Sequence, residues 1–222
     1  YGPCAFMDSY NPKTVFSSID KFGRYSFSNQ PPITKWNLSR FAECLIPLIN
    51  KDENKAIEMA NESIDNFQKI YETKWLDMMK SKIGLFGEDK NDKELINDLL
   101  NWMTNSKADY TNTFCYLMNI KIGNTEIYKD KYFTNWINNW KKRLLINNVS
   151  KEKQLTIMKS VNPNVIPRNH KVEEALKSAD GGDLKIMNKL LSILNKPYDI
   201  KENIQEYQSP SNDINYQTFC GT

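Results

Sequence analysis

The sequence has little histidine and cysteine. Its 222 residues include one histidine, His170, and four cysteines, Cys4, Cys44, Cys115 and Cys220. None of the cysteines belongs to a C-x-x-C pair, so a zinc site has few ligands available. Cys44 and Cys115 lie in apolar helical patterns and are expected to pack as small hydrophobic residues. This cysteine usage is typical of an intracellular protein with reduced thiols.

The sequence also lacks a strong net charge and a long apolar run. Thirty Lys and Arg residues against 27 Asp and Glu residues give a formal net charge of +3. Nucleic-acid-binding proteins usually concentrate basic residues instead. No stretch of about 18 apolar residues occurs, so no membrane span is expected. We therefore expect neither a nucleic acid nor a membrane among the partners of this chain.

Familiar nucleotide-binding and kinase motifs are missing from the chain, which has no G-x-G-x-x-G, no Walker lysine loop, no V-A-I-K and no H-R-D. Three polar groups remain as candidates. The adjacent carboxylates of Glu173-Glu174 would point in different directions on a helix, which favours a solvated face. The triplet Arg168-Asn169-His170 is either a binding group or a structural one, because a lone histidine at a helix start is often a structural hydrogen-bonding residue. The basic run Trp140-Lys141-Lys142-Arg143 either contacts phosphates or is a solvated helix end.

Helical periodicity dominates the chain after Pro32. Apolar residues recur every three to four positions, which predicts helices over 33–48, 52–84, 92–103, 109–118, 133–144, 150–158, 172–179 and 183–194. No strand alternation persists over five residues. The fold class is therefore predicted as mainly α, with over half of the residues in helix, and the aromatic stripes are expected to form the core.

Local signals mark several predicted helix ends. Asp52, Ser150 and Asp183 are suitable N-caps. Pro47 indicates an end or a kink of the first helix, and Gly181-Gly182 are expected to stop the seventh.

The two ends of the chain differ from the helical part. Residues 1–32 hold much of the Gly, Pro and Ser and are predicted to form a long loop, because no helical period occurs there. The aromatic residues Phe16, Phe22, Tyr25 and Phe27 favour order in this loop, since they need packing partners. We therefore divide the chain into a loop (1–32), a helical domain (33–197) and an irregular tail (198–222).

The opening residues indicate a longer parent protein. The chain begins with Tyr1-Gly2 rather than Met, and these two residues look like the last two letters of a D-F-G element. In kinase-like enzymes the Asp of that element holds a metal ion on the phosphates of ATP. We expect this Asp to precede Tyr1, so that the chain is part of an enzyme and carries almost none of its chemistry. The alternative is an ordinary surface loop.

Several motifs together resemble the selenoprotein O family, and the resemblance extends over nearly the whole chain. They are Tyr1-Gly2-Pro3-Cys4-Ala5-Phe6-Met7-Asp8, Phe16-Ser17-Ser18-Ile19-Asp20, Gly23-Arg24-Tyr25, Asn29-Gln30-Pro31, Trp36-Asn37-Leu38, Asp109-Tyr110-Thr111, Asn162-Pro163, Pro167-Arg168-Asn169-His170, Val172-Glu173-Glu174-Ala175, Gly182-Asp183 and Asn195-Lys196-Pro197-Tyr198.

The resemblance implies a protein-kinase-like fold of which this chain is the helical C-lobe-like part, with an N-terminal activation-segment loop. Members of the family are pseudokinases that transfer AMP from ATP to Ser, Thr or Tyr hydroxyls of proteins, so ATP and Mg are implied as cofactors of the full-length parent. The family residues that bind phosphate and metal lie before the position of Tyr1. Tyr1 and Gly2 thus flank the metal-binding Asp, and no catalytic, cofactor-binding or metal residue is expected in this chain. We expect the fragment alone to bind neither cofactor and to be inactive.

The resemblance also implies a redox residue. Cys220 matches the place where some members carry selenocysteine near the C-terminus, although Gly221-Thr222 follows where many relatives have Ser-Ser. Cys4 is the available partner in the opening loop. A bridge between Cys4 and Cys220 is a hypothesis that requires Cα atoms within about 7 Å.

The expected partners are the protein substrates of the parent enzyme and its N-terminal lobe, which would dock on exposed apolar surface of this chain. The family implies a cytoplasmic location, or a mitochondrial one if the protein is eukaryotic. A stand-alone helical module that binds a protein partner is the alternative function. An active protein kinase is less well supported, because kinase motifs are absent.

Overall fold

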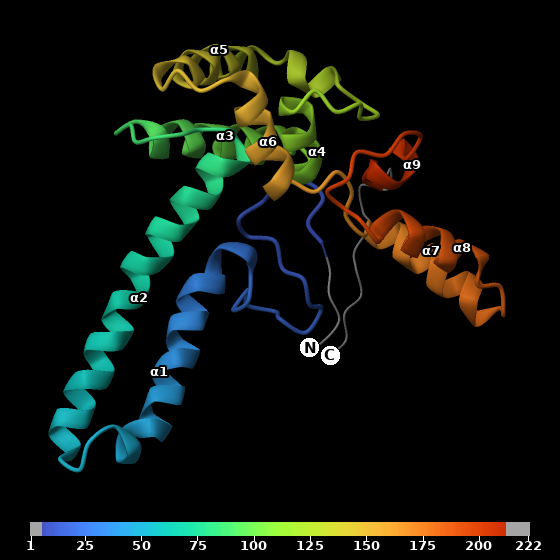
Figure 1. The fold of residues 1–222 in the computed structure, drawn as a ribbon. Coiled ribbons are helices and arrows are strands. Elements are labelled where there is room, and N and C mark those ends of the chain that lie inside the picture. The colour runs from blue at the N-terminus through green and yellow to red at the C-terminus, as the bar shows by residue number, and fades with distance from the viewer. Residues whose placement is uncertain (1–5, 212–222) are drawn as a thin grey trace.

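The computed structural model describes residues 6–211, and over half of these residues are helical (Figure 1). This confirms the mainly α prediction. None of the helices in that range is long and apolar enough to cross a membrane. In chain order the elements are η1 (Phe27–Asn29), α1 (Gln30–Ile49), α2 (Glu53–Lys82), α3 (Asp92–Ser106), α4 (Tyr110–Leu117), η2 (Glu126–Lys129), α5 (Lys131–Ile146), α6 (Lys151–Val161), α7 (Asn169–Asp180), α8 (Lys185–Leu194) and α9 (Gln205–Gln208).

Helices α1 and α2 form a long antiparallel hairpin that projects from the rest of the molecule (Figure 1). The Asp52 side chain caps α2 by accepting the N–H groups of Asn54 and Lys55, as predicted. Pro47 lies inside α1, and the helix ends two residues later, at Ile49. The sequence therefore located the turn of the hairpin correctly.

The main core lies where the end of α2 meets α3, α4, α5 and α6. Aromatic residues dominate it, and the indole N–H groups of three tryptophans are satisfied inside it. Trp136 Nε1 donates to the Leu95 carbonyl at 2.8 Å, and Trp140 Nε1 donates to the Ile83 carbonyl at 2.8 Å. Trp102 Nε1 donates to a carboxylate oxygen of Asp130 at 3.0 Å. These partners allow the large rings to be buried without leaving a polar group unpaired.

The prediction that every aromatic stripe is core is wrong for the hairpin. Trp36 is 48% exposed, Phe41 60% and Leu48 81%. Among the elements of residues 6–211, α1 packs mainly on α2 and η1, so most of its surface has no cover there. Cys44 on α1 is likewise exposed, contrary to expectation, whereas Cys115 on α4 is buried as predicted.

Side-chain caps mark the starts of α4, α5 and α6. Asp109 and Ser150 each accept a backbone N–H of the helix that follows, α4 and α6. Asp130 does the same for α5, which begins earlier than its apolar pattern indicated. Helix α8 begins at Lys185 with Leu184 at the N-cap position, so the prediction that Asp183 is the N-cap is wrong by one residue. Asp183 nevertheless accepts the N–H of Lys185 at 2.9 Å.

Helices α7 and α8 pack against each other as a second, shorter hairpin (Figure 1). A small separate core of Val165, Ile193 and Ile204 lies at its base. The connector between α6 and α7 follows the end of α6 at the main core and contributes Val165 to this small core. It carries Arg168, the largest of the fully buried side chains.

A buried ion pair joins the basic run of α5 to α3. Arg143 Nε donates to Asp92 Oδ1 at 2.6 Å, and Arg143 Nη2 donates to Asp92 Oδ2 at 3.0 Å and to the Phe86 carbonyl at 2.9 Å. Both side chains are almost fully buried. Arg143 therefore belongs to neither a solvated helix end nor a phosphate site. Its neighbours Lys141 and Lys142 are exposed.

Replacing Arg143 with Met should lower the free energy of unfolding by about 3–5 kcal/mol, because the buried Asp92 would lose its two close hydrogen bonds to the guanidinium and keep only the 3.7 Å contact with Lys80. Urea unfolding followed by circular dichroism measures this change. Lys141→Met on the exposed side of the same helix should stay within about 0.5 kcal/mol of the parent chain. Equal losses in the two variants would show that the pair does not hold α3 and α5 together.

Candidate functional site

The residues that were expected to flank the metal-binding Asp or to have a redox role lie outside residues 6–211. They are Tyr1, Gly2, Cys4 and Cys220. Their geometry, including a Cys4–Cys220 bridge, therefore stays a prediction. Within 6–211, no group of three or more His, Cys, Asp or Glu side chains is placed to hold a metal ion.

The carboxylates of Glu173 and Glu174 lie on the exposed face of α7. Lys171 Nζ donates to Glu174 at 3.0 Å and also pairs with Glu206 on α9. His170 is half-buried at the start of α7, and burial lowers the pKa of its imidazole. These positions favour the solvated-face interpretation of the two glutamates.

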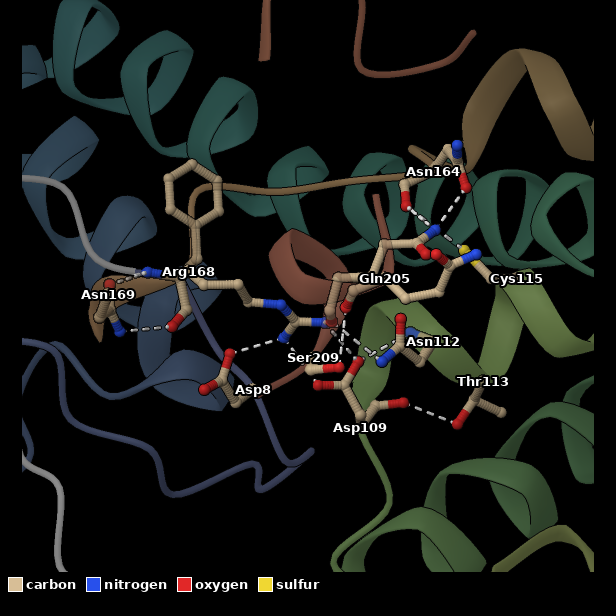
Figure 2. A network of polar contacts seen from close by, with 12 residues as sticks. Asp8, Asp109, Asn112, Thr113, Cys115, Asn164, Arg168, Asn169, Gln205 and Ser209 are labelled. Carbon is tan, nitrogen blue, oxygen red and sulfur yellow. Dashed lines mark hydrogen bonds and ion pairs between the residues drawn. The ribbon is translucent and has the colours of Figure 1, made fainter. Parts of the chain in front are cut away.

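Arg168 is the centre of a buried polar network (Figure 2). Its side chain is 1% exposed and directly precedes α7. Nη1 donates to Asp8 Oδ1 at 2.6 Å and to Asp109 Oδ2 at 2.7 Å. Nη2 donates to Asp109 Oδ1 at 3.1 Å and to the backbone carbonyl of Gln208. One guanidinium thus joins the opening loop, the start of α4 and α9 to the connector before α7.

Asn169, the next residue, binds the opening loop through its amide group. Asn169 Nδ2 donates to the Phe6 carbonyl at 3.1 Å, and the Phe6 N–H donates to Asn169 Oδ1 at 3.4 Å. A side-chain amide that exchanges two hydrogen bonds with one residue fixes the position of that backbone. Arg168 and Asn169 of the triplet therefore have the structural role, because they bind the chain's own loop.

The loop is also paired with the segment before α4. The Tyr110 N–H donates to the Asp8 carbonyl at 2.8 Å, and the Tyr10 N–H donates to the Ala108 carbonyl at 2.9 Å. These bonds form a single antiparallel bridge between Ser9 and Asp109. We refer to residues 6–10, held by these bonds and by Arg168 and Asn169, as the anchored loop segment.

A second layer of amides supports the Arg168 network (Figure 2). Gln208 Nε2 donates to the Asn164 carbonyl at 2.9 Å and to Asn164 Oδ1 at 2.8 Å. Asn112 Nδ2 donates to the Gln208 carbonyl at 3.1 Å, the same carbonyl that Arg168 binds. Burial raises the pKa of the nearby Cys115 to about 12, so its sulfur is an unreactive thiol at neutral pH.

The charges of the network are unequal, with one guanidinium and two carboxylates. Burial raises the pKa of the Asp109 carboxyl, and Arg168 opposes that rise. Burial acts to lower the pKa of Arg168, but the Asp109 and Asp8 carboxylates outweigh it and the pKa is raised. Because both terminal nitrogens of Arg168 already bind protein oxygens, this guanidinium holds segments together and is not available to bind phosphate.

Sequence reasoning singled out Arg168 and Asp109 but did not connect them, and it missed Asp8 as their partner. Asp8 and Arg168 are 160 residues apart in the sequence. The only local signal was the presence of both in motifs that resemble one family.

The loop beyond the anchored segment was expected to be ordered by its aromatic residues. Phe16 does pack against the main core. Phe22, however, is 98% exposed, and Tyr25 is half exposed. The backbone instead makes local bonds, such as the Phe27 N–H to the Thr14 carbonyl at 2.9 Å. The expectation that all four rings pack is therefore wrong.

Comparison with known proteins finds relatives along the whole chain. The family model described as "Protein adenylyltransferase SelO" matches residues 1–195. The chain is 58% identical to a protein of Pelagibacter ubique, 48% identical to one of Clostridium beijerinckii and 47% identical to one of Nitrosococcus oceani. Each is named "Protein nucleotidyltransferase YdiU". Each alignment covers 100% of this chain but 46% of the relative, so the chain spans about half the length of these relatives.

Replacing Asp8 with Ala should loosen the anchored loop segment while the helices stay folded. A hydrogen bond to a charged group contributes about 1.5–3 kcal/mol, so the Tyr10 and Tyr110 amides should exchange hydrogen at least about tenfold faster. Hydrogen exchange followed by NMR measures this change. Glu173→Ala, on the exposed face of α7, is the matched control and should leave both rates unaltered. Unchanged protection in the Asp8 variant would contradict the anchoring role.

Proposed function

This chain belongs to the protein adenylyltransferase SelO family, and we propose that it is the helical C-terminal half of a protein adenylyltransferase. The whole protein would be a pseudokinase that transfers AMP from ATP to Ser, Thr or Tyr hydroxyls of other proteins with the help of Mg. The observation that carries this proposal is the family match over residues 1–195, together with relatives that are named nucleotidyltransferases and are about twice as long.

In the proposed reaction, the acceptor hydroxyl oxygen attacks the α-phosphorus of ATP. The bond between that phosphorus and the bridging oxygen of pyrophosphate breaks, and the hydroxyl proton passes to a base. Such a reaction needs cations around the phosphates and a positioned base. We assign these groups to the part of the protein outside this chain, because the buried guanidinium groups of Arg143 and Arg168 are both already paired with carboxylates.

Within this proposal, residues 1–32 act as the activation-segment-like loop of a kinase-like fold, and the helices act as its C-lobe. The anchored loop segment supports this role, because it fixes one end of the loop on the helical body. The exposed rings of Phe22 and Tyr25 lie further along the loop, where they are accessible to an acceptor protein or to the rest of the parent. A redox link between Cys4 and Cys220 and a cytoplasmic location, or a mitochondrial one in a eukaryote, belong to the same proposal.

A stand-alone helical module that binds a protein partner is the second candidate. The exposed apolar residues of α1, such as Phe41 and Leu48, favour it. In the enzyme, the same surface would receive the N-terminal lobe. The reading frame upstream of Tyr1 distinguishes the two candidates. An Asp codon directly before Tyr1, preceded by a kinase-like N-lobe, supports the enzyme, whereas a start codon beside Tyr1 supports the module.

Labelled AMP transfer tests the enzymatic proposal. The full-length parent, incubated with Mg and ATP labelled at the α-phosphate, should label protein acceptors, and the 222-residue chain should label none. ATP labelled at the γ-phosphate should give no labelled protein with either sample. Transfer of the γ-label would identify a kinase, and transfer of the α-label by the 222-residue chain alone would contradict the assignment of the catalytic groups to the other half.

A further inference from the structure

Lys82, the last residue of α2, has a buried side chain with an unusual environment. It is 7% exposed, and Nζ lies 4.3 Å from the ring centroid of Phe114 and 5.4 Å from that of Tyr110. Lys80, one half-turn earlier, lies 3.7 Å from a carboxylate oxygen of Asp92. By contrast, none of the carboxylates in residues 6–211 forms an ion pair with Lys82.

The Lys82 side chain lines a cavity of about 300 Å³. The start of α4 contributes Tyr110 and Phe114, and the opening loop contributes Phe6, Phe16 and Phe27. The connector after α6 closes another side with Pro163 and Ile166. The cavity therefore has mainly aromatic and aliphatic walls, two neutral polar residues, Thr111 and Asn162, and one cationic group. Its size is at the lower end of the range for small-molecule sites, which are mostly apolar with a few placed polar groups.

The aromatic rings compensate only part of the cost of burying this ammonium group. The attraction between a cation and an aromatic ring is smaller than the cost of burying a charge without an anionic partner. Burial accordingly lowers the pKa of Lys82 to about 8. An anion in the cavity would replace the missing partner and return the ammonium to its charged form.

The walls decide which anion fits. A phosphate carries up to two charges and several acceptor oxygens, which need several donors. This cavity offers one cation, and its other polar lining residues are Thr111 and Asn162, whose Nδ2 already donates to the Lys82 and Met158 carbonyls. A carboxylate has a single charge and can bind one ammonium group, while a hydrocarbon body fills the space between the rings. We propose that this cavity binds a small monocarboxylic acid with an aromatic or aliphatic body, with its carboxylate on Lys82 Nζ.

Lys82 is expected to change its charge near pH 8, whereas the titratable groups that face it are not. Cys115 and Tyr110 on α4 face it, and burial raises the pKa of Cys115 to about 12 and raises that of Tyr110 further. Burial also raises the pKa of Tyr10 in the opening loop. These three groups stay neutral between pH 7 and pH 9. Asp8 and Asp109 are paired with Arg168 and not with Lys82.

Calorimetric titration of the 222-residue chain with 3-phenylpropanoate tests the proposal, with 3-phenylpropanamide as the neutral analogue of the same shape. The acid should bind at pH 7 with a dissociation constant in the millimolar range or tighter, and the amide should bind at least about tenfold more weakly. Because Lys82 loses its proton as the pH rises through about 8, the affinity for the acid should fall about tenfold between pH 7 and pH 9.

Two lysine variants locate the site. Lys82→Met keeps the length of the apolar stem and should weaken binding of the acid at least about tenfold. Lys153→Met is the matched control, because Lys153 also lies over a ring, that of Phe86 at 5.4 Å, but is exposed and does not line the cavity. It should bind the acid like the parent chain. Circular dichroism establishes that each variant is folded.

Equal affinities for the acid and the amide would overturn the proposal, as would binding to folded Lys82→Met that matches the parent chain. Absence of saturable binding up to about 10 mM would overturn it too. If Lys82→Met fails to fold, the comparison of acid with amide on the parent chain decides alone, because it requires no substitution.

Discussion

The paired contact of Arg168 with Asp8 and Asp109 is the interaction on which the arrangement of this molecule most depends. The apolar faces of these helices could be buried in many different packing arrangements. Few of those arrangements also bring two carboxylates within hydrogen-bond distance of one buried guanidinium. Removing one partner of a buried pair typically costs about 3–5 kcal/mol, since the remaining charge keeps its desolvation penalty. The network therefore fixes which segments meet, and it brings together the opening loop, α4, α9 and the connector before α7.

This network and the Arg143–Asp92 pair are two buried ionic contacts that join different elements of the fold. Arg143 joins α3 to α5 at one end of the main core, and Arg168 joins the loop to the helices at the other. Both arginines bind backbone carbonyls as well as carboxylates. Buried polar groups paired in this way add specificity that an apolar core alone would lack, although Arg168 Nε itself has no hydrogen-bond partner among residues 6–211. In the proposed enzyme, this rigidity would position the loop for the half of the protein that holds the nucleotide.

The sequence predicted the features that depend on neighbouring residues. The starts of α2, α4 and α6 follow from Asp52, Asp109 and Ser150, because each cap acts within three residues. The family was also predicted correctly from the combined motifs. Exposure of Phe41 and Leu48 was not predicted, since a periodic stripe identifies a helix face but does not say what covers it. The pairing of Asp8 with Arg168 and the burial of Lys82 were missed because they depend on contacts between distant segments.

The central claim is that Asp8 and Arg168 act as a pair that holds the loop on the helical body. A double-mutant cycle tests it most directly, with urea unfolding of the parent chain, Asp8→Ala, Arg168→Met and the double variant. Direct coupling predicts that the double variant loses less stability than the two single losses combined, by about 1.5–3 kcal/mol. Additive losses, with a coupling energy near zero, would contradict the claim.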